Sequence, residues 1–321
     1  MSEVKQLKTS LVESLRTGDL APEEAVKQFE KITPTQHKTG RIYTQKGTDE
    51  RRDQYLKARR IRAEIKESRT PFISPAFLPG FWLSQGLVVV GAESGKAKST
   101  TCSNVLYGFL STSDHKTAIV ISNEEATDAV YERTACIALQ KDYTQFFQGK
   151  LSQREETQIT EFVVNHIIPR VEVVEDGTFD MSYLEDVQSV LETAASARVG
   201  LVLIDYLQII TQSRSKPDTE SFQISKLLGH FLKDYGKTNG VPVVCFVQLN
   251  PDSAGPTMAV RIQNDKTFFN HGFACIEIKP DFETLTTEFT VHKDRFFGHT
   301  GKKVTADFRG GRYNFVGEES L

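Results

Sequence analysis

The chain has 321 residues, of which 25% are charged and 39% hydrophobic, and its formal net charge is -3 at pH 7. This length suits one large domain with an extension, because a single hydrophobic core stops growing near about 250–300 residues. The slight excess of acidic residues excludes a uniformly basic nucleic-acid coat protein, although a few loops can still carry local positive charge.

No apolar run approaches the roughly 20 residues that cross a bilayer, and the N-terminus lacks the apolar segment of an export signal. We therefore expect a cytoplasmic protein that does not bind membranes. The four cysteines lie far apart and form no CxxC pair, so we expect buried thiols rather than a zinc site or a disulfide framework.

Residues 1–80 are polar, and their sixteen Lys and Arg exceed their eleven Asp and Glu, which marks them as a basic appendage. We interpret them as an N-terminal helical segment and linker, with helices predicted over 21–32 and 49–67. The Pro-rich stretch 70–80 then forms an extended connection. The segment is a candidate docking element for a neighbouring subunit, while its Arg-rich second helix could equally be a solvated face.

From residue 81 onward, short apolar runs alternate with helical stretches, which is typical of a parallel sheet with helical crossovers. Buried strands are predicted over 86–91, 117–123, 170–174, 199–205 and 241–248. Helices are predicted over 99–110, 124–139, 182–197 and 221–237. After Phe273 we expect an antiparallel β extension with a turn near 298–301. The expected fold is an α/β domain over 81–321.

A phosphate-binding loop is indicated where the first of these strands meets the first helix. Its candidate nucleotide-binding residues are Glu93, Ser94, Gly95, Lys96, Ala97, Lys98, Ser99 and Thr100. Backbone N–H groups would wrap the phosphates of ATP or another NTP, Lys98 would reach the β and γ oxygens, and Ser99 would bind Mg²⁺. Ala97 stands where such loops usually have glycine, and its Cβ restricts a backbone conformation that glycine adopts freely.

Polar side chains end three further predicted strands. Asp205 follows an apolar run and suits ordering of Mg²⁺, although an isolated Asp there is often a turn residue. Glu124, with Glu125 beside it, could polarise an attacking water or could stabilise the dipole of the next helix. The amide of Gln248 could sense the γ-phosphate.

These positions together resemble the DnaB-type replicative DNA helicases over about residues 87–315. The stretches that carry the resemblance are Ile204-Asp-Tyr-Leu-Gln208, Ser122-Asn-Glu124 followed by Arg133, and Gln248-Leu-Asn250. Near the C-terminus, Lys293 and Arg295 resemble that family's Lys-x-Arg-x-Gly hairpin, although a surface hairpin with ordinary charges would look the same.

The resemblance implies a RecA-like P-loop NTPase core that hydrolyses ATP between the subunits of a ring, expected to be hexameric, and translocates on single-stranded DNA. Glu124 would be the catalytic base, Asp205 the Mg²⁺-organising acid and Gln248 the sensor. Lys293 and Arg295 would reach the γ-phosphate bound by the neighbouring subunit, as an arginine finger.

The loops after Asp205 and after Gln248 would face the channel of such a ring. Their candidate DNA contacts are Arg214, Lys216, Arg261 and Lys266. Spaced cations of this kind suit the backbone of single-stranded DNA, although a solvated loop has the same composition.

The chain differs from the bacterial members in lacking their large N-terminal helical domain, which indicates a compact phage-type helicase acting in the host cytoplasm. Candidate partners are further copies of the chain, single-stranded DNA, and a primase, polymerase or loader. Two other classes remain open. A RecA-like recombinase or loader would form filaments, and a nucleotide-binding replisome scaffold would not unwind; Ala97 favours the scaffold, whereas the complete hydrolytic set argues against it.

Overall fold

The computed structural model of the protein describes residues 56, 70–78, 81–83, 86–112, 116–122, 125–174, 180–194, 199–251, 258–262 and 266–315. The chain divides into two units, Met1–Arg60 and Ile61–Leu321, and all described residues except Leu56 belong to the second. The helices predicted over 21–32 and 49–67 lie outside the described residues, apart from Leu56, which is helical. The predicted domain boundary stays a prediction.

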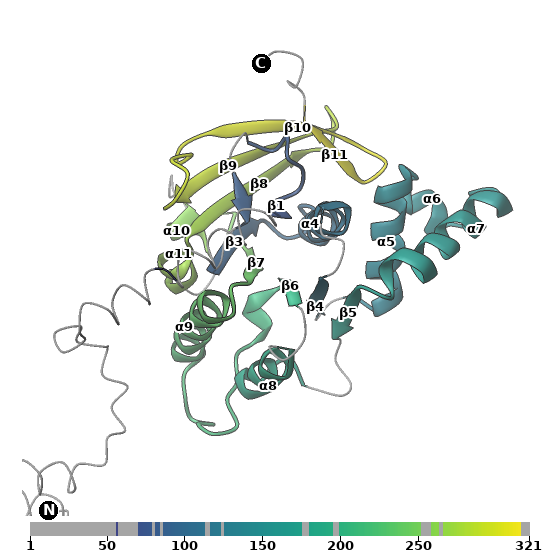
Figure 1. Ribbon diagram of the computed structural model, residues 1–321. Helices are drawn as coiled ribbons and strands as arrows, with labels where there is room; N and C mark the ends of the chain where they lie inside the picture. The colour runs from purple at the N-terminus through teal and green to yellow at the C-terminus, as the bar shows by residue number, and fades with distance from the viewer. Residues whose placement is uncertain are drawn as a thin grey trace, which may run out of the picture. The chain divides into compact units, whose positions relative to one another are not determined.

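One mixed sheet forms the centre of the second unit (Figure 1). Its parallel strands are β3 (Gly86–Ala92), β4 (Thr117–Ser122), β5 (Val171–Val174), β6 (Val199–Asp205), β7 (Pro242–Gln248) and β8 (Ala274–Asp281). Its antiparallel strands are β9 (Thr286–Asp294), β10 (Lys303–Arg309) and β11 (Arg312–Phe315). Within the described residues, the order is β11-β10-β9-β8-β3-β7-β6-β4-β5. The predicted mainly parallel sheet with an antiparallel extension is confirmed, and β11 is a strand beyond those predicted.

The inner strands are buried because helices cover both faces of the sheet. In β3, Val88 and Val90 belong to one core cluster, while Leu87 and Val89 belong to the other. Successive side chains of a strand point to opposite faces, so each strand contributes to both clusters. This two-sided burial is the reason that the inner strands are continuous apolar runs in the sequence.

The helices predicted between the strands are present, with small differences at their ends. They are α4 (Lys98–Thr112), α5 (Thr127–Leu139), α8 (Leu184–Ala194) and α9 (Ser221–Asn239). Helices α4 and α5 pack into one core cluster, and α8 and α9 into the other. In α9, Ile224, Leu228 and Leu232 recur every four residues and form its buried face. Among the residues that the structure describes, no helix has the length and hydropathy that a bilayer crossing requires.

A helical arm that the sequence analysis did not predict follows α5. It consists of α6 (Tyr143–Phe147), α7 (Gln153–Phe162) and a π-helical turn, η2 (Val163–Ile167). Figure 1 shows α6 and α7 beside α5, to one side of the sheet. Helix α7 begins with a capping box, in which Ser152 and Glu155 satisfy each other's backbone N–H groups. This Ser-x-x-Glu pattern is visible in the sequence and would have located the start of the helix.

Among the described residues of the Pro-rich stretch predicted as an extended connection, only β1 (Thr70–Pro71) is a strand, and it pairs with β2 (Trp82–Leu83). The following residues bend back, and Phe72 and Phe77 are buried. The Phe77 ring lies edge-on to that of Phe289 in β9, with 5.5 Å between ring centroids. Burial of such large rings ties this stretch to the core of the β extension.

We expect Phe77→Ala to lower the free energy of unfolding by about 3–5 kcal/mol, because it leaves a cavity in this aromatic cluster. Chemical denaturation followed by circular dichroism would measure the loss. The matched control is Phe147→Ala in α6, whose side chain is 76% exposed and should change stability by no more than about 0.5 kcal/mol. Equal effects of the two substitutions would contradict the packing described.

Candidate nucleotide-binding site

The phosphate loop is the turn that joins β3 to α4. Helix α4 begins at Lys98, and its first turn is closed by the Thr101 amide, which donates to the Ala97 carbonyl oxygen at 2.9 Å. The Lys98 side chain is buried and folds back over the loop, where its Nζ donates to the Glu93 carbonyl oxygen at 3.3 Å. The Lys98 ammonium therefore lies close to the N-terminus of α4, where a phosphate would bind.

Ala97 adopts a left-handed backbone conformation, which glycine reaches freely and a residue with a Cβ does not. Its φ is 60°, close to the 68° of Gly95 in the same loop. For a residue with a Cβ, this conformation costs about 1–2 kcal/mol relative to a right-handed one. The alanine thus fits the fold of a phosphate loop, and the loop stores a small strain that glycine would relieve.

The parallel register brings the predicted site residues to one edge of the sheet. Ala92, the last residue of β3, pairs with Gln248, the last of β7, and Ser122 at the end of β4 pairs with Asp205 at the end of β6. All four strands run in the same direction, so their carboxyl ends lie beside the phosphate loop. This edge is where open α/β sheets bind ligands.

Negative charge gathers beneath the first turns of α4. The Asp205 residue is 4% exposed. Burial raises the pKa of the Cys102 thiol well above its usual value, and the charges of Asp205 and Glu125 raise it further. The buried carboxylate of Asp205 is of the kind that suits Mg²⁺, a hard cation with oxygen ligands. In the part of the chain that is described, no three His, Cys, Asp or Glu side chains gather as a metal-binding cluster. Ser99 and Asp205 stay the predicted Mg²⁺ ligands.

Glu125, the neighbour of the predicted base Glu124, is held by Arg133. The guanidinium of Arg133 on α5 forms a bidentate ion pair with the Glu125 carboxylate, with Nη2 2.7 Å from Oε1. Ser122 Oγ also donates to the Glu125 carbonyl oxygen at 2.8 Å. Both carboxylate oxygens of Glu125 are thus engaged. Glu124 lies outside the described residues, and its role as base stays a prediction.

Gln208 is a site residue to which the sequence analysis assigned no role. It lies in η3 (Leu207–Ile209), the turn after β6. Its side-chain amide donates to the Gln248 carbonyl oxygen at 3.0 Å and accepts from the Gln248 backbone N–H at 3.1 Å. This double hydrogen bond fixes the end of β7 against the end of β6, and so positions the backbone of the predicted sensor.

The cations of the C-terminal hairpin contact a helix of the same chain. Lys293 Nζ donates to the carbonyl oxygens of Phe269 at 2.5 Å and Asn270 at 3.1 Å, in α11 (Thr267–His271). Arg295 Nη2 donates to the Asn270 carbonyl oxygen at 3.1 Å. Partial burial lowers the pKa of Lys293. Cations suit a helix C-terminus, and the finger role stays a prediction.

The loop after β6 is tied to α8 by one carboxylate. Glu185 accepts hydrogen bonds from Ser213 Oγ at 2.6 Å, from the Arg214 N–H at 3.0 Å and from Ser215 Oγ at 2.6 Å. Burial opposes ionisation of Glu185, but these hydrogen bonds outweigh it and lower its pKa to about 2. Arg214 pairs with Asp186 at 2.6 Å and stays half-exposed. Its loop neighbour Lys216 is exposed, as is Lys266 before α11.

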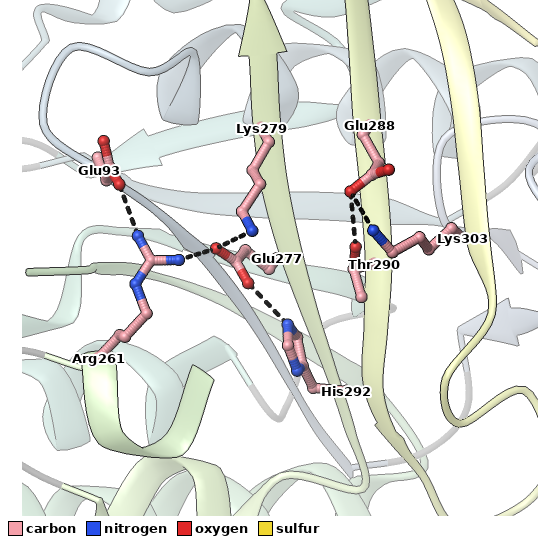
Figure 2. A network of polar contacts seen from close by, with 8 residues as sticks. All are labelled: Glu93, Arg261, Glu277, Lys279, Glu288, Thr290, His292 and Lys303. Carbon is pink, nitrogen blue, oxygen red and sulfur yellow. Dashed lines mark hydrogen bonds and ion pairs between the residues drawn. The ribbon is translucent and has the colours of Figure 1, made fainter. Parts of the chain in front are cut away.

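Arg261, predicted as a DNA contact, lies in an ion-pair network instead of extending from an open loop (Figure 2). It ends α10 (Met258–Arg261), and its guanidinium pairs with Glu93 of the phosphate loop at 2.5 Å and with Glu277 of β8. His292 Nε2 lies 2.7 Å from the second oxygen of Glu277. Burial opposes ionisation of Glu277, but its bond to His292 and the nearby cations outweigh it and lower its pKa. A DNA contact by Arg261 stays a prediction.

A mainly parallel sheet with a phosphate loop after an inner strand, and with polar side chains at the neighbouring strand ends, defines a RecA-like P-loop domain. Residues 76–256, more than half of the chain, match the DnaB-like helicase C terminal domain, and the chain belongs to this family. Both the recognised family and the expected fold are thereby confirmed.

Curated relatives agree with this assignment. The chain is 24% identical over 197 residues to the replicative DNA helicase DnaB of Mycoplasma pneumoniae, covering 58% of this chain and 40% of that protein. It is 24% identical over 174 residues to the DnaB of Mycoplasma genitalium, covering 53% and 36% respectively. The chain therefore spans well under half the length of these relatives.

Solved structures share the fold. The ATPase domain of G40P matches with a TM-score of 0.65 at 12% identity, over 83% of this chain and 98% of that one. A DnaB-like replicative helicase, studied with its primase interactions, matches with a TM-score of 0.64 at 12% identity, over 97% and 76%. The RadB recombinase matches with a TM-score of 0.50 at 14% identity, over 76% and 96%. At these identities the likeness shows the fold alone.

We expect Lys98→Ala to weaken binding of a fluorescent ATP analogue at least tenfold, because it removes the only buried lysine described in the phosphate loop. Titration followed by fluorescence anisotropy would measure the dissociation constant. Lys96→Ala is the comparison, since Lys96 Nζ lies 5.2 Å from the Phe282 ring centroid and its loss should change affinity much less. A larger effect at Lys96 would mean that Lys96, and not Lys98, is the lysine that binds the phosphates.

A pH-dependent stabilisation is expected from Glu185. Its folded pKa of about 2 lies below the unfolded value of about 4.3, so the ionised carboxylate stabilises the folded state. This contribution is complete above the unfolded pKa and is lost as the pH falls toward the folded one. The difference in Tm between wild type and Glu185→Gln should therefore be largest at neutral pH and shrink in acid. A difference that does not vary with pH would contradict the role of the ionised form.

Proposed function

We propose that this protein is an ATP-dependent replicative DNA helicase, which translocates on single-stranded DNA as a ring of six copies. The family match over 76–256 carries this proposal. Two curated relatives, each 24% identical to the chain, are replicative DNA helicases. We place its action in the cytoplasm, and in the host cytoplasm for a phage-type member.

The chemistry proposed for the site is hydrolysis of ATP, or another NTP, with Mg²⁺. Lys98 and the backbone of the phosphate loop hold the phosphates, and Ser99 and Asp205 hold the metal ion, which neutralises charge on the phosphates when bound. Glu124 polarises the attacking water. This assignment is supported by the neighbouring Glu125, whose two oxygens are occupied by Arg133.

Completion of the site by a second subunit is proposed from the C-terminal hairpin. Lys293 and Arg295 contact the carbonyl end of α11 in their own chain, at a surface position where Arg295 is exposed. In the ring, the two cations would leave these carbonyls for the γ-phosphate of the neighbouring site. In the site of its own chain, Gln248, positioned by Gln208, would sense the γ-phosphate and relay its loss to the following loop.

The proposed macromolecular ligands follow from the exposed cations. Arg214, Lys216 and Lys266 are exposed in the stretches after β6 and β7 and would contact the phosphates of single-stranded DNA. A primase, polymerase or loader is a candidate partner; one solved relative is described with its primase interactions. A filament-forming recombinase would share this fold, and the mass and symmetry of the assembly would separate the two.

The test is steady-state ATP turnover with and without single-stranded DNA, measured on wild type, Glu124→Ala and Arg295→Ala together with the oligomer mass. We expect DNA to stimulate turnover, and each substitution to reduce it about 100-fold or more. Mixing the two variants should restore part of the activity, because Glu124→Ala subunits still supply the finger to intact neighbouring sites. Arg154→Ala, exposed on α7, is the control.

The outcomes separate the competing functions. Absence of turnover in a wild-type protein that assembles and binds DNA would exclude the motor and favour a scaffold. Turnover without recovery in the mixture would mean that Arg295 does not act in the neighbouring site. Strand exchange by an open filament, without unwinding of a forked duplex, would favour the recombinase.

A further inference from the structure

Arg261 joins the phosphate loop to a strand of the β extension through one guanidinium group. One nitrogen, Nη2, lies 2.5 Å from Glu93 Oε1, and the other, Nη1, pairs with Glu277 Oε1. Figure 2 shows the guanidinium between the two carboxylates, with Glu93 on one side and Glu277 on the other. The fork geometry of arginine allows this bridge, whereas a lysine ammonium would act as a point charge on one flexible stem.

The two ends of the bridge differ in burial, and this decides which end can open. The Glu277 side chain is 3% exposed and also contacts His292 and Lys279, at 2.7 Å and 3.3 Å. The Glu93 side chain is 34% exposed. Separating a buried pair leaves uncompensated charge, whereas an exposed carboxylate can be solvated by water. The Arg261–Glu277 contact is therefore the fixed end, and the Arg261–Glu93 contact is the end that can be released.

The backbone at Arg261 is also attached to the strand that ends in the predicted sensor. The Asn250 N–H, two residues after Gln248, donates to the Arg261 carbonyl oxygen at 2.7 Å. Leu249 and Ile262 form an antiparallel bridge next to this bond. Helix α10 is thus connected to the end of β7 by its backbone and to the phosphate loop by the Arg261 side chain.

We propose that Arg261 is a positioning residue that couples the phosphate loop to the second predicted DNA-facing stretch. Arg261 and Lys266 both belong to this stretch. Because Glu93 pairs with Arg261, a change at Glu93 would alter how α10 is held, and therefore how the stretch meets DNA. This inference rests on the proposed function and deepens it. A positioning role differs from a direct DNA contact by Arg261, because a positioning role requires the buried Glu277 as much as it requires the arginine.

The test measures how strongly nucleotide and DNA affect each other's binding. The dissociation constant of a fluorescein-labelled oligo-dT is measured by anisotropy, on the assembled protein, with and without a non-hydrolysable ATP analogue and Mg²⁺. The ratio of the two constants is the coupling factor, which must also describe the effect of DNA on nucleotide binding. Couplings of this kind are typically about 5- to 150-fold.

In the wild type we expect a coupling factor of about 5-fold or more. Arg261→Gln and Glu277→Gln should each reduce it to within about twofold of one. Arg261→Lys should keep an intermediate factor, because it retains the charge but not the fork. Glu93→Gln provides a further variant at the more exposed end if Glu277→Gln fails to fold. Lys303→Gln is the control; it removes an exposed ion pair with Glu288, 2.9 Å long, on the same sheet.

A direct DNA contact predicts a different pattern. Arg261→Gln would then weaken DNA binding by the same factor with and without nucleotide, and would reduce the salt dependence by about one charge, while Glu277→Gln would have no effect. That pattern, or a wild type that binds both ligands without coupling, overturns the inference. A wild type that binds neither nucleotide nor DNA contradicts the proposed function itself.

Discussion

Parallel pairing of β3 with β7 and of β4 with β6 is the constraint on which the rest of the site depends. The register aligns Ala92 with Gln248 and Ser122 with Asp205, so residues far apart in the chain end at the same edge of the sheet. A shift by one residue would turn each polar end toward the opposite face. Such a shift would also disrupt the close packing on both buried faces of these strands.

Around this edge, several polar side chains form hydrogen bonds with backbone groups and so hold backbone segments in place. Gln208 holds the backbone of Gln248, Glu185 holds the loop after β6, and Lys293 holds the end of α11. The Gln208 contact joins the ends of β6 and β7, the Glu185 contacts join the loop after β6 to α8, and the Lys293 contacts join the C-terminal hairpin to α11.

The outline of the fold could be predicted because its signals are local. Continuous apolar runs marked the inner strands, and helical stretches between them marked the crossovers. The arm of α6 and α7 was missed because its residues are largely exposed, although the Asp142 N-cap and the Ser152 capping box mark where its two helices begin. The burial of Phe77 was missed because nothing in a Pro-rich stretch indicates its contacts with strands more than 200 residues away.

The sequence by itself determined the phosphate loop, the polar strand ends and the left-handed constraint at Ala97, because these depend on neighbouring residues and on strand direction. Only the tertiary structure decided which side chains are already engaged. Glu125 and Arg261 look like free charges in the sequence, yet each is paired, one with Arg133 and the other across Glu93 and Glu277. The physical reason is that ion pairs need no fixed spacing along the chain, and a buried charge is tolerated only where the fold brings a partner to it.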